Sequence, residues 1–140
     1  MALLLDSETV PPRGRVEAIN ATVAAAEVPM TFFDNSGGDP RLRLHYSAMG
    51  TGSHVALAAD TGSRLRRTAR QLELPAPARV GIALHLGSRG FLTAGGADTA
   101  TEPGHLHLAD ETRTFDYRCA GLGGMKAFGS TMSSWECRST

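Results

Sequence analysis

The stretch that decides the fold is RVGIALHLGSRGFLTA, residues 79–94. Its apolar residues recur at every second position, and a period of two is typical of a β-strand. These residues are Val80, Ile82, Leu84 and Leu86. The glycines of GSRG and of the following AGG indicate a bend and then a turn. The strongest element of the chain is therefore predicted to be a strand with short connections on either side.

Similar alternation extends through most of the chain after residue 40. Short alternating segments recur in residues 41–47, 54–60, 98–101, 105–110 and 114–119, separated by Gly- and Pro-containing turns. Roughly seven short strands at regular intervals are typical of a sandwich or barrel. Before them, Pro11–Glu27 carries apolar residues three and four positions apart, which predicts one amphipathic helix. Its stripe consists of Val16, Ile19, Val23 and Ala26.

Length and composition indicate one soluble domain. The chain has 140 residues, 41% hydrophobic and 20% charged, with 14 basic and 14 acidic side chains. This balance argues against binding of nucleic acid or acidic membranes through net charge. The start, MALLLDSE, lacks the basic region of a signal peptide, and no stretch is long enough to span a membrane. Cys119 and Cys137 lack metal-ligand spacing, and reduced thiols in a cytoplasm are the simplest interpretation, with a disulfide left open.

Two histidines raise the question of a metal site. His105 and His107 share one face of a predicted strand, and Leu106 and Leu108 share the other. Each buried leucine contributes about 1.5–3 kcal/mol, so the leucines are expected to face the core and the histidines solvent or an interface. A metal would also need a third ligand, for which His85 is the candidate. A metal centre is therefore kept as the alternative.

Other motifs do not form a catalytic set. Glycine clusters at 50–52 and 121–124 lack the spacing of a dinucleotide fingerprint or a phosphate loop. The basic run of residues 64–70 predicts a solvated face, or one arginine turned inward to a polar or anionic ligand. Phe115 and Tyr117 lie on one strand face, in the core or lining a pocket. We therefore expect a protein that is not an enzyme and has no cofactor.

The order of these motifs resembles a known family. From Arg41 onward, RRTARQLEL, VGIALHLGSRGFLTAGG and EPGHLHLADETRTFDYRC follow one another as in the N-terminal effector-binding domain of AraC-type transcription regulators. Pro103, Gly104, Leu106, Leu108 and Asp110 match the family pattern of a Pro-Gly turn, a leucine-rich strand and an acidic turn. Many relatives carry Asp after Pro-Gly, where this chain has a histidine, which leaves a pH-sensitive or metal-linked role open.

This resemblance implies a mainly β, cupin-like double-stranded β-barrel or sandwich with an N-terminal α-helix. It implies a cytoplasmic bacterial protein that binds an unknown small-molecule effector inside the barrel and can form a homodimer. By position, Phe115 and Tyr117 are candidate effector-binding residues, and Arg67 is a further candidate. The expected organisation is an extension at 1–11, the domain at 12–128 and a polar, disordered tail at 129–140.

The expected function is effector sensing and dimerisation in a transcription regulator. No recognition helix follows the domain, so we expect a truncated regulator that does not bind DNA by itself. Two rivals remain: a small metal-dependent cupin enzyme using His105, His107 and His85, and an interaction module that senses nothing.

Overall fold

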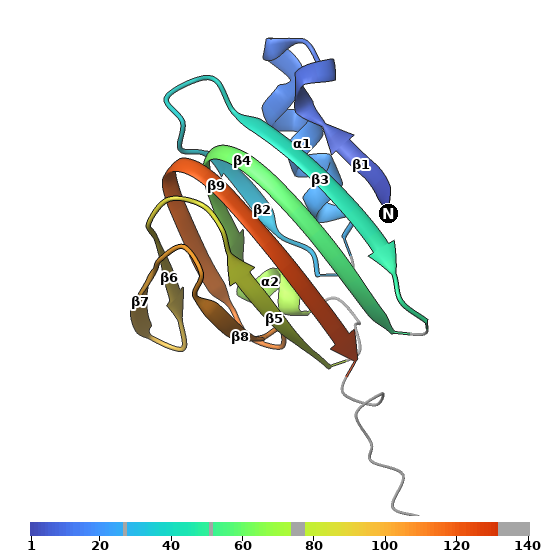
Figure 1. Cartoon of the computed structure of the whole chain (residues 1–140), viewed down its shortest axis with the longest axis vertical. Helices are drawn as coiled ribbons and strands as arrows, with labels where there is room; N and C mark the ends of the chain where they lie inside the picture. Colours follow the sequence, from blue (N-terminus) through green and yellow to red (C-terminus); the bar gives the residue numbers. More distant parts are fainter. Residues whose placement is uncertain (27, 51, 74–77, 132–140) are drawn as a thin grey trace, which may run out of the picture.

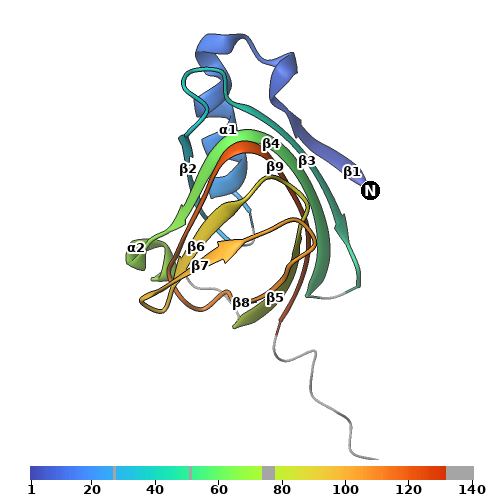
Figure 2. The same ribbon diagram turned by 60° about the vertical axis from the view of Figure 1, so that its left-hand side comes forward.

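The fold of the protein, given by a computed structural model, is an antiparallel sheet that curves into a barrel (Figures 1 and 2). The structure describes residues 1–26, 28–50, 52–73 and 78–131. Its main path runs β1-β3-β4-β9-β5-β8; β2 pairs with β4, β6 pairs with β9, and β7 pairs with β6. The strands are β1 (Ala2–Asp6), β2 (Thr31–Asp34), β3 (Arg41–Ala48), β4 (Ser53–Arg67), β5 (Arg79–His85), β6 (Gly90–Ala94), β7 (Ala97–Thr101), β8 (Leu106–Asp110) and β9 (Phe115–Thr131). The helices are α1 (Arg15–Ala24) and α2 (Ala69–Leu72), with 3₁₀ turns at Ser7–Thr9 and Pro12–Gly14.

The two longest strands, β4 and β9, form the arch of the barrel (Figure 2). Their antiparallel register shifts between Thr61 and Ser63, where Gly62 adopts a φ of +60°. A Cβ atom at Gly62 would lie 2.5 Å from the Ser36 backbone, so a side chain at this bulge has no room. Bulges bend a strand, and here the strand pair continues past the bend to reach β2 on one side and β6 on the other.

Helix α1 packs against the inner face of the sheet near β2 and β3. The apolar cluster that holds it consists of Ile19, Val23, Phe32 and Leu42. The Asn20 side chain accepts a hydrogen bond from Phe32 N (2.8 Å) and donates one to Phe32 O (2.9 Å), which ties the helix to β2. The predicted helix is therefore present, although Val16 of its stripe is 39% exposed.

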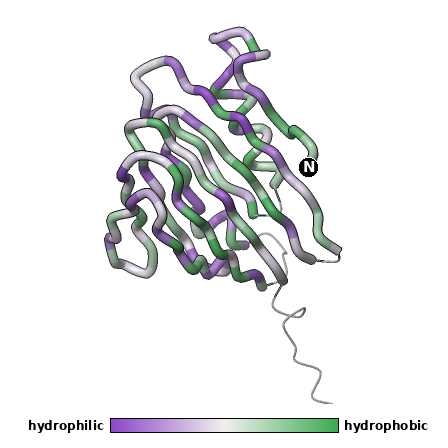
Figure 3. Tube along the Cα trace, viewed as in Figure 1, coloured by the Kyte–Doolittle hydropathy of each residue, from purple (hydrophilic) through white to green (hydrophobic). Residues whose placement is uncertain are grey.

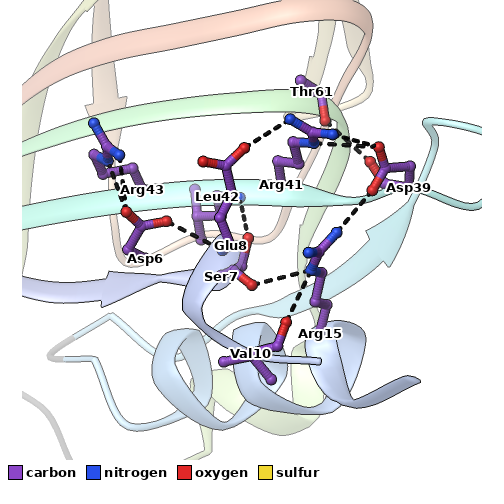
Figure 4. Close-up of polar contacts among 10 residues, drawn as sticks. All are labelled: Asp6, Ser7, Glu8, Val10, Arg15, Asp39, Arg41, Leu42, Arg43 and Thr61. Atoms are coloured by element: carbon purple, nitrogen blue, oxygen red, sulfur yellow. Dashed lines mark hydrogen bonds and ion pairs between the residues drawn. The ribbon is translucent and has the colours of Figure 1, made fainter. Parts of the chain in front are cut away.

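The first residues of the chain belong to the sheet. β1 pairs with β3, and Figure 4 shows the polar contacts that fix the following turn. Ser7 Oγ accepts a hydrogen bond from Leu42 N at 2.8 Å, and Arg15 donates to Asp39 at 2.8 Å. Residues 1–11 are thus not a separate extension. At the other end β9 runs through Thr131, so residues 129–131 are strand where a polar tail was expected, and residues 132–140 lie outside the described residues.

The predicted orientation of the leucines in β8 is wrong. Leu106 is 69% exposed and Leu108 is 76% exposed, whereas His107 is on the inner face. Leu108 pairs with Ile82 on the outer face, and His107 pairs with Ala83 on the inner one. Figure 3 shows polar and apolar segments mixed along the strands. The rule that leucines take the interior failed because the inner face of β5 and β8 consists of small and polar residues.

Candidate ligand-binding site

The interior of the barrel is lined by small residues on the central strands. Cross-strand pairing places Gly81 of β5 beside Gly129 of β9, and Ala83 beside Ala127. A glycine inside a strand often marks the close approach of another group. Here the approaching groups are polar side chains: a Cβ at Gly129 would overlap the His54 ring, and one at Gly81 would lie 2.6 Å from Glu111 Oε1. The small residues therefore make space for buried polar groups.

One polar cluster joins two strands, β4 and β5, and the turn after β8. Arg79 at the start of β5 makes a buried hydrogen bond with His54 of β4, with 2.8 Å between Arg79 Nη2 and His54 Nδ1. Arg79 also forms an ion pair with Glu111, in which Nε lies 3.3 Å from Oε2. Both residues of this ion pair are largely buried, so the guanidinium and the carboxylate compensate each other's loss of hydration.

A second polar cluster surrounds Tyr117 of β9. Its hydroxyl lies 3.3 Å from His85 Nδ1, and His85 Nε2 lies 2.6 Å from the Ser88 carbonyl oxygen, to which it donates. Burial, followed by the neighbouring Cys119 and Asp60, raises the pKa of Tyr117, so the phenol is protonated at neutral pH. Burial also raises the pKa of Asp60, and Ser63 and His85 oppose this shift. This cluster therefore gathers a phenol, an imidazole and a carboxyl group in the interior.

The histidines at positions 85, 105 and 107 do not form a metal-binding group among the described residues. Both nitrogens of His85 already have partners, as described above. His105 is exposed, and its ring centroid lies 6.4 Å from that of His107. In the described part of the chain, no group of three or more His, Cys, Asp or Glu side chains could hold a metal ion. These residues therefore do not fit the metal centre of the rival interpretation.

Several buried polar atoms of the interior have no hydrogen-bond partner among the described residues. They are Asp60 Oδ1, Thr101 Oγ1, His107 Nε2, and Nε and Nη1 of Arg67. Thr101 is 1% exposed and Arg67 is 5% exposed. Native proteins satisfy the great majority of such groups. Such atoms are therefore candidates for contact with a bound molecule, and of these residues Arg67 lines a pocket.

The predicted effector-binding residues lie together on this inner face. Arg67 of β4 pairs directly with Phe115 of β9, and Tyr117 follows two residues later on the same face, paired with Leu65. An open pocket of about 320 Å³ lies at this end of the barrel. Its walls are formed by Arg66–Ala69, Thr93–Gly96 and Thr114–Asp116. The other arginines of the basic run differ from Arg67: Arg66 is exposed at the pocket wall, Arg70 is exposed outside it, and Arg64 pairs with Asp116.

Sequence reasoning did not find the cluster of His54, Arg79 and Glu111. These residues are far apart in the chain and follow no motif. The available signal was the pair of glycines inside predicted strands, Gly81 and Gly129, which marked where side chains from other strands come close.

Comparison with known proteins identifies the class of fold. No protein-family model matches the chain, and no curated protein matches it in sequence. The crystal structure of the AraC-like transcriptional activator CuxR superposes with a TM-score of 0.78 over 94% of this chain, at 12% identity. This chain covers 48% of that activator, or about half its length.

Cupin structures match over a shorter part of the chain. The Cnp3 cupin domain of Schizosaccharomyces pombe has a TM-score of 0.54 at 7% identity, over 66% of each chain. A predicted oxalate decarboxylase of Thermotoga maritima has a TM-score of 0.54 at 12% identity, over 74% of this chain and 92% of its own. The protein therefore has the expected mainly β, cupin-like fold with an N-terminal helix. No helix within the described ranges is both long and apolar enough to span a membrane.

Proposed function

We propose that the chain is the effector-sensing domain of a bacterial, cytoplasmic AraC-type transcription regulator. The observation that carries this proposal is the set of buried inner-face atoms without partners, which a bound small molecule would satisfy. The likeness to CuxR over nearly the whole chain supports the same function. An effector that binds one barrel conformation more tightly would shift the population toward it, and so change how the domain meets another copy or a DNA-binding region.

A ligand screen, repeated on a variant with a blocked pocket, tests this function. The melting temperature of the chain is measured against a library of small metabolites, and hits are repeated on Ala94→Trp. Ala94 is an exposed residue of the pocket wall, so a tryptophan should fill the pocket without disturbing the core. The matched control is Ala97→Trp, because Ala97 pairs with Ala94 but lies outside the pocket. Hits that persist in Ala94→Trp, or a screen without hits, contradict the proposal.

The proposal includes binding without catalysis. In its favour, both nitrogens of His85 take part in hydrogen bonds and His105 is exposed, which argues against a metal centre built from the three histidines. We expect chelators to leave ligand binding and melting unchanged. Stoichiometric metal in the purified protein, lost on replacing His107, would favour the enzyme instead.

Dimerisation is a further part of the proposal. The outer faces of β5 and β8 expose Ile82, Leu106 and Leu108, and paired sheet faces of this kind bury apolar area in many assemblies. We expect sedimentation to show a dimer that Leu108→Asp disrupts. A monomer at all concentrations would remove dimerisation from the proposed mechanism without affecting ligand binding.

A further inference from the structure

We infer that the effector is a small monoanionic organic acid whose carboxylate binds the Arg67 guanidinium. This inference rests on the proposed ligand-binding function and adds the chemical class of the ligand. It is carried by the burial and partners of Arg67, by the charges around it, and by the pocket beside it.

Arg67 is a buried cation in which two of the three guanidinium nitrogens have no hydrogen-bond partner among the described residues. The residue is 5% exposed, and neither Nε nor Nη1 has a partner in the part of the chain that the structure describes. The other buried arginine of the interior, Arg79, differs in this respect because it contacts His54 and Glu111. A buried charge without a partner is costly, so such groups persist where a ligand uses them.

Carboxylates near Arg67 also pair with other arginines. Glu111 is the carboxylate that acts on Arg67, and the same carboxylate pairs with Arg79. Glu111 therefore acts on both arginines, and Nε and Nη1 of Arg67 still have no hydrogen-bond partner among the described residues. Asp116 lies in the pocket wall, but both of its oxygens accept from Arg64, at 3.0 and 2.6 Å. A carboxylate, with its single negative charge, matches the one guanidinium whose Nε and Nη1 lack partners among the described residues.

The surroundings of Arg67 suit a carboxylic acid with an apolar body. A guanidinium donates strong, charge-assisted hydrogen bonds to a carboxylate, and Nε and Nη1 of Arg67 each have a hydrogen that no described residue accepts. Phe115 pairs with Arg67 across the strands and, with Ala69 and Ala94, provides apolar pocket wall. The hydroxyl residues of the same wall are Thr68, Thr93 and Thr114. We therefore expect an aliphatic or aromatic monocarboxylate.

Arginine side-chain NMR tests the inference. The Nε–H signals of the ¹⁵N-labelled chain are recorded during titration with propionate and benzoate, and with propionamide and benzamide as neutral isosteres. Arg67→Met identifies the Arg67 signal, and Arg70→Met, at an exposed position of the same basic run outside the pocket wall, is the matched control. We expect the acids to shift the Arg67 signal saturably and to raise the melting temperature, and the amides to do neither. Binding of the acids should weaken at least tenfold in Arg67→Met and persist in Arg70→Met.

The outcomes separate this inference from the function on which it rests. If the Arg67 signal does not move at about 50 mM acid, well above the range of weak specific binding, the inference is overturned. If neutral compounds bind the wild type and lose affinity in Ala94→Trp, the sensing function stands without the carboxylate. Without ligand, Arg67→Met should melt at a higher temperature than the wild type, because it removes an unpaired buried charge. A lower melting temperature would show that Arg67 is a structural residue and would overturn the inference.

Discussion

His54 and Arg79 contact each other across the interior, with 2.8 Å between Nδ1 and Nη2, and the His54 ring lies over Gly129. The contact joins β4 to β5, although β9 lies between them in the sheet. The glycine on β9 is what allows the imidazole to reach the guanidinium. The buried contact therefore depends on Gly129 as much as on His54 and Arg79 themselves.

Gly129→Ala should destabilise the protein through this contact. The added Cβ would overlap the His54 ring, and forced rearrangement in a packed interior costs about 1–3 kcal/mol. His54→Ala removes the ring, so the double variant should lose less stability than the sum of the two single variants. Urea denaturation of the four proteins measures this coupling. Strict additivity would mean that the ring does not rest on Gly129.

Asp60→Asn should stabilise the protein at neutral pH. Burial raises the pKa of Asp60 above the ordinary 3.8, so the folded state disfavours the charged form. The resulting loss of stability begins as the pH rises through 3.8 and is complete above the raised pKa. The asparagine variant should therefore gain roughly 1–3 kcal/mol at pH 7, and no gain should appear near pH 3. Glu17→Gln, which removes an exposed carboxylate, is the control.

The sequence predicted the strands better than the site. Alternation through Val80, Ile82 and Leu84 identified β5 and correctly placed His85 on the opposite face. Alternation alone does not show which face of a strand points into the barrel. Leucine burial would decide this only if the interior were apolar and the outer face polar. Here the interior holds polar groups, and the outer face carries Leu108. Arg67 was a candidate ligand-binding residue because it lies in a basic run. That it is buried while its neighbours are not depends on the strand register and on the bulge in β4.

Substitutions of the outer leucines should test the corrected orientation of β8. Leu106→Ser and Leu108→Ser should each change the stability of the monomer by about 0.5 kcal/mol or less, because both side chains are exposed. Ile19→Ala should cost about 2–5 kcal/mol, since Ile19 is fully buried under the sheet. Denaturation is measured at a concentration low enough to keep the chains monomeric. Losses of several kcal/mol in the leucine variants would place these side chains in the core after all.

Acid should weaken the fold through His107. Burial, then the nearby His85 and His105, lowers the pKa of His107 below the ordinary 6.5. A histidine with a lowered folded-state pKa takes up its proton more readily in the unfolded chain. The stability that its neutral form provides is therefore complete above pH 6.5 and is lost as the pH falls through 6.5 toward the lowered value.

Replacing the imidazole should flatten this pH dependence. His107→Gln should lose less stability than the wild type between about pH 7 and pH 5, the interval in which histidine titrates. His45→Gln, on the outer face where His45 pairs with Leu57, should behave as the wild type does. Urea denaturation across the pH range measures the slopes, and an NMR titration of the His107 ring measures the pKa directly. A ring that titrates at or above pH 6.5 would show that His107 is hydrated, and that β8 does not turn it toward the interior.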